Sequence, residues 1–457
     1  MRYHALACDY DGTIATGGLV SAETLAALEA VRNSQRKIVL VTGRILDDLN
    51  NTFSRMDLFD RVVAENGAVL YCPATGKQRL LADPPPQEFI DELVRRGPAH
   101  VSTGRVIVAT RSPHETTAVE VIRELGLELQ IIFNKGAVMI LPSGVNKATG
   151  LNTALHELGL SRHNAVGIGD AENDHAFLSQ CECSVAVENA LEALKEQTEW
   201  VTAGPNGDGT AELIRSLIAT DLEFLRDRLP HRLDLGKRRD GTGVWIEPYG
   251  RNVLLSGTQD SLGLTFVRRF LDRLKEKQYQ FALLDLNGNY SDMSAGTAVG
   301  DHLQLPTVRQ IVEILSGPDQ NAIVSLTGIP LNQRSTFLQE LWLKLQELRQ
   351  SVGRPHWIVL ADGDDAIRSS LRAAMPEELR KMGGIMVIAH EANRLPFQML
   401  SAMDLVLVTG KTPTKTFEDV STAMGQSPPT FPLMRGQGEL AAWFPRSSGL
   451  PFALEVG

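Results

Sequence analysis

Short apolar runs alternate with amphipathic stretches along residues 1–220. The runs YHALACD and KIVLVTGR predict buried strands, and SAETLAALEAVRNSQ between them predicts a helix with Ser21 as its N-cap. Later runs predict further strands at RVVAENGAVLY, NAVGIGDAEND, CSVAVENA and EWVTAG, and a helix is predicted at Ala219–Arg228. This alternation is typical of a parallel sheet whose strands are joined by helices.

An insert interrupts this alternation and has its own order of elements. It reads as a helix, a strand, a second helix and two strands, a unit small enough to sit over the sheet as a lid. After Pro230 a second α/β series begins near Leu233. We therefore predict a core of residues 1–82 and 143–219, a lid of residues 83–142, a linker at 220–232 and a second domain of residues 233–457.

Composition and charge narrow the class of protein. The chain of 457 residues is 43% hydrophobic and 22% charged, as in water-soluble proteins with two or three domains. No apolar run is long enough for a membrane span, no signal peptide is visible, and four irregularly spaced cysteines do not predict a disulfide framework. We expect a cytoplasmic protein with no membrane partner.

The charge is distributed unevenly. Residues 1–224 carry 30 acidic and 19 basic side chains, whereas residues 225–457 carry 25 and 26. An acidic half that holds an anionic substrate needs a bound cation or focused basic groups. Neither half has the clustered basic face of a dedicated nucleic-acid binder, so nucleic acid is not an expected partner.

Polar clusters follow the apolar strands of the first half. They are Asp9 and Asp11, then Thr42-Gly43-Arg44, then Lys147, and finally Asp170 with Asn173 and Asp174. An isolated Asp-x-Asp-Gly is an ordinary turn sequence. Because the carboxyl ends of parallel strands lie at one edge of a sheet, however, these clusters are expected to converge. Several carboxylates that converge suit Mg²⁺, and a hydroxyl and a lysine suit phosphoryl oxygens.

The quoted stretches resemble the haloacid dehalogenase superfamily of phosphatases, in the branch whose α/β lid follows the second motif. The matching stretches are DYDGT, VTGR, NK at Asn146-Lys147 and GDAEND, in the family's order and spacing, together with AENGA. The resemblance covers about residues 1–219. It implies a Rossmann-like hydrolase core, an inserted lid and Mg²⁺ as cofactor.

The resemblance also implies catalytic and metal-binding roles. Asp9 would be the nucleophile that forms an aspartyl-phosphate, and Asp11 would protonate the leaving alcohol and then deprotonate the attacking water. Mg²⁺ would be held by the Asp9 carboxylate, the Asp11 backbone carbonyl and Asp170. Asp174 would steady the metal-bound waters or Lys147 from behind these ligands.

Phosphate binding is assigned in the same way. The amide of Gly12, the Thr42–Gly43 turn and the Lys147 ammonium would contact the phosphoryl oxygens, with Asn173 nearby. Arg44 and Asn66 are rim candidates that could face the substrate or be structural.

The substrate is left open. Tyr10 in DYDGT is similar to trehalose-phosphate phosphatases and to archaeal-type phosphoglycolate phosphatases, and the small lid resembles the latter more. Arg105, Arg111 and Lys135 of the lid could face a leaving group, but solvated surface charge is the plainer interpretation of each.

The second half shows the layout of a phosphate-binding loop without its motif. The stretch GRNVLLSGTQDSLGLTFVRRFLDRL predicts a strand, a loop with Gly257 and a long helix. The position of the P-loop lysine is occupied by Gly263 in an ungapped alignment and by Leu264 when one inserted residue is allowed. This half resembles the DNA-pumping P-loop ATPases, with Asp362 at the metal position of HWIVLADGDDAI and Gly363 in place of the catalytic acid. An α/β domain that binds no nucleotide is the alternative.

These observations predict a Mg²⁺-dependent phosphomonoesterase of a small phosphorylated metabolite, either a sugar phosphate or a phosphoglycolate-like acid. The second domain is expected to be a degenerate P-loop-like domain with an assembly or regulatory role. One alternative is a regulatory protein in which that domain binds nucleotide or nucleic acid, and another is a phosphomutase or phosphotransferase. Nucleotide binding by the second domain and homo-oligomerisation stay open.

Overall fold

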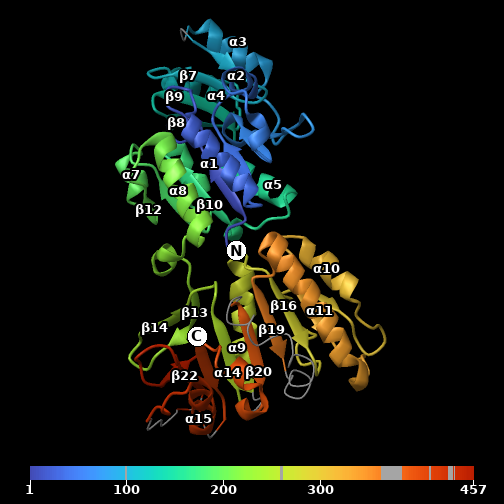
Figure 1. Ribbon diagram of the computed structural model, residues 1–457. Coiled ribbons are helices and arrows are strands. Elements are labelled where there is room, and N and C mark those ends of the chain that lie inside the picture. Colours follow the sequence, from blue (N-terminus) through green and yellow to red (C-terminus); the bar gives the residue numbers. More distant parts are fainter. Residues whose placement is uncertain are drawn as a thin grey trace. The chain divides into compact units, whose positions relative to one another are not determined.

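The computed structural model describes residues 1–97, 100–257, 261–361, 383–410, 413–430, 436 and 438–456 (Figure 1). The chain forms two compact units, Met1–Leu229 and Pro230–Gly457, which we describe separately. None of the helices described in either unit is long and apolar enough to cross a membrane.

An eight-stranded sheet forms the centre of the first unit. Its strands, in spatial order, are β12 (Trp200–Val201), β11 (Cys183–Ala186), β10 (Ala165–Gly169), β1 (Ala5–Cys8), β2 (Lys37–Val41), β3 (Arg61–Ala64), β4 (Val69–Cys72) and β5 (Lys77–Leu80). The strands from β12 to β3 run parallel, and β4 and β5 are antiparallel. The parallel strands consist mainly of buried apolar residues, as expected for strands covered on both faces.

The register of this sheet brings the polar clusters together. Cys8 at the end of β1 lies opposite Ile168 of β10 and Leu40 of β2, so the residues that follow these three strands emerge side by side. The predicted convergence at one sheet edge is confirmed.

Helices cover the faces of this sheet. They are α1 (Ala22–Asn33), α2 (Leu46–Thr52), α5 (Lys147–Glu157), α6 (His175–Leu178), α7 (Glu192–Lys195) and α8 (Asn206–Thr220). The Ser21 hydroxyl accepts the Thr24 amide and caps α1, as the sequence predicts. The helix predicted at Ala219–Arg228 is confirmed only in part, because α8 ends at Thr220, Asp221 and Leu222 are left-handed, and a separate 3₁₀ helix covers Glu223–Arg228.

Residues 221–229, assigned above to a linker, instead belong to the first unit. Asp221 pairs with Arg36 at 3.0 Å, and Leu222 and Leu225 are buried. The short helix η5 (Glu223–Arg228) therefore completes the first unit.

The lid has a sheet and a core of its own. Its elements are α3 (Gln87–Arg95), β6 (Ser102–Thr103), β7 (Val108–Arg111), α4 (Glu115–Glu124), β8 (Leu129–Asn134) and β9 (Ala137–Pro142), and the antiparallel strand order is β6-β7-β9-β8. Phe89 and Leu93 of α3 and Val121 of α4 pack with Val108 and Ile140 of the sheet. The predicted order of elements is present, with β6 as an added strand.

The second unit is built on an eleven-stranded sheet. Its strands, in spatial order, are β14 (Gly243–Ile246), β13 (Leu233–Lys237), β23 (Phe452–Glu455), β22 (Glu439–Trp443), β21 (Leu405–Val408), β15 (Asn252–Ser256), β20 (Ile385–Ala389), β19 (Trp357–Ala361), β16 (Phe281–Asp285), β18 (Ala322–Ser325) and β17 (Thr297–Val299). The strands from β21 to β17 run parallel. The described helices of eight or more residues are α9 (Ser261–Glu276), α10 (Val308–Ser316), α11 (Leu331–Val352) and α15 (Pro413–Met424), and α14 (Phe397–Leu400) is shorter.

Both faces of this second sheet are apolar. Val253 of β15 packs in the cluster that contains Phe266 and Phe270 of α9, whereas its neighbour Leu254 packs with Trp342 of α11 on the other face. Side chains that alternate along a strand point to opposite faces, so the helices form a layer on each side. Gly257 lies between β15 and α9, whereas Asp362 and Gly363 lie outside the described residues.

Candidate active site

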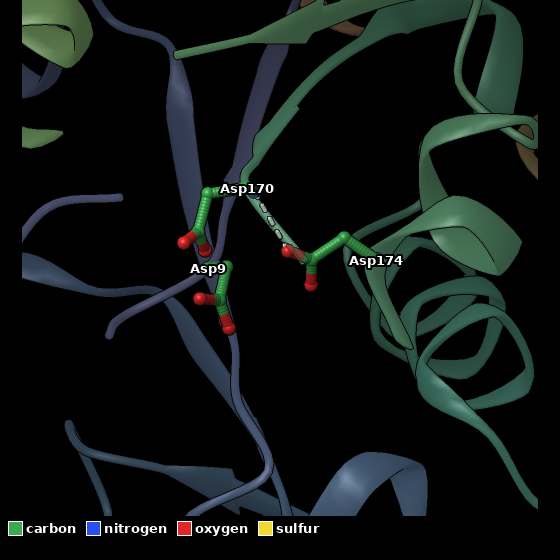
Figure 2. A group of neighbouring side chains, drawn as sticks. All are labelled: Asp9, Asp170 and Asp174. Carbon is green, nitrogen blue, oxygen red and sulfur yellow. Dashed lines mark hydrogen bonds between the residues drawn. The ribbon is translucent and has the colours of Figure 1, made fainter. Parts of the chain in front are cut away.

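Three carboxylates lie together at the carboxyl edge of the first sheet. Asp9 follows β1, Asp170 follows β10, and Asp174 lies in the short helix η4 (Glu172–Asp174) (Figure 2). One oxygen from each lies within 4.8 Å of those of the other two, and all three residues are buried. Burial raises the pKa of the Asp9 carboxyl group to about 8; the charge of Asp174 adds to this rise and the Lys147 ammonium opposes it.

Lys147 supplies a buried positive charge to this cluster. It is the first residue of α5, whose N-cap is Asn146, and its ammonium donates to Asp9 Oδ1 at 2.5 Å and to Asp174 Oδ1 at 2.6 Å. Burial alone lowers the pKa of Lys147, but the charges of Asp174 and Asp9 outweigh it and raise that pKa above its usual value. The ammonium therefore stays charged beside Asp9.

The hydrogen bonds distinguish Asp174 from the other two carboxylates. Asp174 Oδ2 accepts the amides of Asp170 and Ala171 at 2.8 and 2.9 Å, and its Oδ1 accepts Lys147. Both of its oxygens are thus engaged by the protein. This arrangement suits the predicted role of Asp174 behind the metal ligands.

Asp9 and Asp170 can hold a divalent cation. Asp170 Oδ1 accepts the Thr13 hydroxyl at 3.1 Å, and its Oδ2 accepts the Lys135 ammonium. Burial is the main cause that raises the pKa of Asp170, so the buried carboxylate favours a nearby positive charge. Two buried carboxylates with backbone carbonyl and water oxygens make the hard ligand set that Mg²⁺ prefers.

The Gly12 backbone passes close to this cluster. Its φ is +86°, and a Cβ on Gly12 would lie 2.2 Å from Asp170 Oδ2. Only glycine fits there without displacing the carboxylate. A Cβ on Gly43, after β2, would lie 3.0 Å from Met139 of the lid and 3.6 Å from Asn173 Nδ2.

Thr42, Asn173 and Asn66 line the same edge. The buried Thr42 hydroxyl accepts the Arg44 amide at 3.1 Å. Asn173 Nδ2 donates to Asn66 Oδ1 at 3.0 Å, and both residues are buried. Asn66 therefore lies beside a phosphate-binding candidate rather than on an exposed rim.

Asp11 points to Arg44 and not to the carboxylate cluster. Arg44 Nε and Nη2 donate to the two Asp11 oxygens at 2.6 and 2.7 Å, and Arg44 Nη1 donates to Asp48 at 2.9 Å. The hydrogen bond to Asp11 raises the pKa of Arg44 above its usual value. Arg44, predicted as a rim residue, thus holds the predicted acid and base, Asp11.

Sequence reasoning missed two contacts between lid and core. The buried Glu65 carboxylate accepts the amides of Arg105, Val106 and Ile107 at 2.9, 2.8 and 3.0 Å. Lys135, interpreted above as surface charge, reaches Asp170. A charged residue directly after a buried strand, such as Glu65 in AENGA, is the one signal that could have indicated the first contact.

Comparison with known proteins identifies the family of the first unit. Residues 6–100 and 102–214 match the haloacid dehalogenase-like hydrolase family. A phosphoglycolate phosphatase of Methanothermobacter thermautotrophicus is 31% identical over 219 residues, which are 46% of this chain and 97% of that protein. The chain belongs to the haloacid dehalogenase-like hydrolases.

A further phosphoglycolate phosphatase and a solved hydrolase structure are also similar to the first unit. A phosphoglycolate phosphatase of Archaeoglobus fulgidus is 29% identical over 221 residues, 47% of this chain and 96% of that protein. The crystal structure of a haloacid dehalogenase-like hydrolase from Bacteroides thetaiotaomicron is 19% identical, with a TM-score of 0.40 over 47% of this chain and 99% of that one. The chain is a phosphoric monoester hydrolase of this family.

Proposed function

We propose that this hydrolase removes the phosphoryl group of a small phosphorylated metabolite, a phosphoglycolate-like acid or a sugar phosphate, through an aspartyl-phosphate on Asp9. The observation that carries this proposal is the buried Asp9–Lys147 pair beside Asp170. The ion pair orients Asp9 Oδ1. Among the described residues, no hydrogen bond to Asp9 Oδ2 is present, so this oxygen is available for the reaction.

In the proposed first step, an Asp9 carboxylate oxygen attacks phosphorus and the ester oxygen leaves. Asp11, which takes up a proton from solvent once it has left Arg44, donates that proton to the ester oxygen, so the leaving group departs as a neutral alcohol. For this step the Asp11 side chain must turn from Arg44 toward the ester.

In the proposed second step, a water molecule attacks the phosphorus of the aspartyl-phosphate. Asp11 takes a proton from this water, and the bond from phosphorus to the Asp9 oxygen breaks to release phosphate and regenerate the carboxylate. The Gly12 amide, the Thr42–Gly43 turn and Lys147 would bind the phosphoryl oxygens. Mg²⁺ held by Asp9, the Asp11 carbonyl and Asp170 would supply positive charge to these oxygens.

Removal of the metal tests this proposal directly. We expect phosphate release from a panel of phosphorylated acids and sugars in Mg²⁺, loss of that release in EDTA, and recovery on adding Mg²⁺.

Asp170→Ala should raise the Mg²⁺ concentration for half-maximal rate at least about tenfold. Glu172→Ala is the matched control, because Glu172 is exposed in the same turn. Identical Mg²⁺ curves for the two variants would contradict the metal site, and transfer of the phosphoryl group to a sugar instead of water would indicate a mutase.

We also propose that the second unit is a degenerate P-loop-like domain with an assembly or regulatory role. The support is the position of β15, which lies at the point where the strand order reverses, between β20 and β21. Such points are where open α/β sheets bind ligands. A cavity of about 200 Å³ is lined there by Gly257, Thr409 and Lys415, among others.

We expect this second unit not to hydrolyse ATP, because its sequence has no P-loop lysine. We expect no ATP turnover by the full chain with Asp9→Asn, which removes any contribution of the phosphatase site. We expect residues 1–229 alone to retain phosphatase activity. The shorter fragment 1–220 is less suitable for this test, because it lacks Asp221, which pairs with Arg36. ATP hydrolysis by the variant, or a folded but inactive 1–229 fragment, would overturn this division of roles.

A further inference from the structure

A tight turn of the lid reaches the carboxylate cluster. Lys135 and Gly136 join β8 to β9, Asn134 pairs with Ala137 across the turn, and both turn residues have positive φ, +46° and +83°. Asn and Gly normally fill such positions, whereas a lysine there carries a backbone cost. Strand β8 packs against η4, the helix that contains Asp174. The turn is therefore placed over the site by contacts on its own strand.

The Lys135 side chain carries a positive charge to the mouth of the site. Its ammonium pairs with the buried Asp170 Oδ2, and it lies 2.9 Å from where a Cβ on Gly12 would be. Yet 48% of the Lys135 side chain is exposed. One side of this lysine thus faces the proposed phosphate loop and the other faces solvent.

The other two cations at this edge are already engaged. Lys147 is buried between Asp9 and Asp174, and Arg44 is held by both oxygens of Asp11. Lys135 is bound by Asp170, which is also a proposed metal ligand. A divalent cation on Asp170 would take over the charge that Lys135 neutralises, and the ammonium would become available to another anion.

We propose that Lys135 is a specificity-determining residue that pairs with a carboxylate in the leaving group of the substrate. This inference rests on the proposed phosphatase function and chooses, within it, phosphorylated carboxylic acids over sugar phosphates. The charges agree with this choice. The three carboxylates face two ammonium groups, so a divalent cation makes the site net positive and able to hold a phosphoryl group and a second anion. A sugar offers Lys135 no counter-charge.

The test compares two substrates that differ in the charge of the leaving group. For Lys135→Gln we expect kcat/KM for 2-phosphoglycolate to fall roughly ten- to hundredfold, mostly through KM, because one charge-assisted hydrogen bond is lost. The value of kcat/KM for p-nitrophenyl phosphate, whose leaving group has no carboxylate, should fall at least about fivefold less, because only the general loss of positive charge at the site affects it. Lys135→Arg should retain the preference for the acid. Arg123→Gln, an exposed change on α4 of the same lid, is the matched control.

A binding measurement separates this role from a structural one. Calorimetric titration of Mg²⁺ alone should show that Lys135→Gln binds the metal at least as tightly as the unaltered protein, since no ammonium has to leave Asp170. Three results for Lys135→Gln would each overturn the proposed role of Lys135. They are an equal fall in kcat/KM for both substrates, no fall in kcat/KM for 2-phosphoglycolate, and weaker Mg²⁺ binding than in the unaltered protein. If the unaltered protein hydrolyses p-nitrophenyl phosphate but not 2-phosphoglycolate, the Lys135 proposal fails alone. If it hydrolyses neither, the proposed function fails and the Lys135 proposal fails with it.

Discussion

Asp9→Asn should abolish phosphatase turnover while the protein stays folded. The amide has nearly the shape of the carboxylate, and its oxygen can still accept the Lys147 ammonium that now contacts Asp9 Oδ1. An amide is a very poor nucleophile, however, so no aspartyl-phosphate should form. Because burial disfavours the charged form of Asp9, loss of its charge should not unfold the first unit.

Phosphate release and thermal unfolding measured on the same sample check this result. Asp57→Asn is the matched control, because Asp57 is an exposed carboxylate paired with Arg55 on the surface. Its turnover should equal that of the unaltered protein. An Asp9→Asn protein that keeps more than a few per cent of the rate would contradict the role of Asp9 as nucleophile.

Lys147→Met should have the second largest effect, on stability and on activity together. Removal of the ammonium leaves Asp9 and Asp174 buried next to each other without the positive charge that joins them. An uncompensated buried charge commonly costs about 3–5 kcal/mol of unfolding free energy. The phosphoryl group would also lose a fixed cation, so KM should rise and kcat should fall.

A double variant separates these two effects. The double variant Lys147→Met with Asp174→Asn removes one of the two unpaired charges. Urea unfolding should therefore show that part of the lost unfolding free energy is restored, whereas turnover should stay low. A single Lys147→Met variant as stable and as active as the unaltered protein would contradict the arrangement. Recovery of turnover in the double variant would show that Lys147 acts only on folding.

The sequence could predict the positions of Asp9, Thr42 and Asp170 because these follow from topology. Each comes directly after a buried parallel strand, and the register of β1 with β2 and β10 brings them to one edge. The contacts of Glu65 and Lys135 could not be predicted in this way. They depend on how the lid packs on the core, and the position of Glu65 directly after β3 indicates a contact but not its partner.

The start of helix α8 shows a second reason why the sequence alone does not predict every element. It begins with Asn206-Gly207-Asp208-Gly209, residues of low helix propensity that indicate a turn. A Cβ on Gly207 would lie 2.2 Å from Thr24 Oγ1 of α1, so the close packing of the two helices requires glycine there. Tertiary packing outweighs propensity at this position, and single-sequence reasoning sees only the propensity.

The Glu65 contact bears on how such lids diversify. All three groups that the carboxylate binds are main-chain amides, which every residue except proline possesses. The contact is therefore indifferent to the side chains at 105–107, while a Cβ on the adjacent Gly104 would come within 2.5 Å of the Glu65 carboxyl carbon. Burial constrains Val106 and Ile107 to apolar residues, so only the exposed position 105 is free to vary, provided that glycine stays at 104 and proline is kept out of the next three positions. A lid from a relative that keeps this loop geometry would preserve the Glu65 contact with the same core, whichever side chain it carries at position 105.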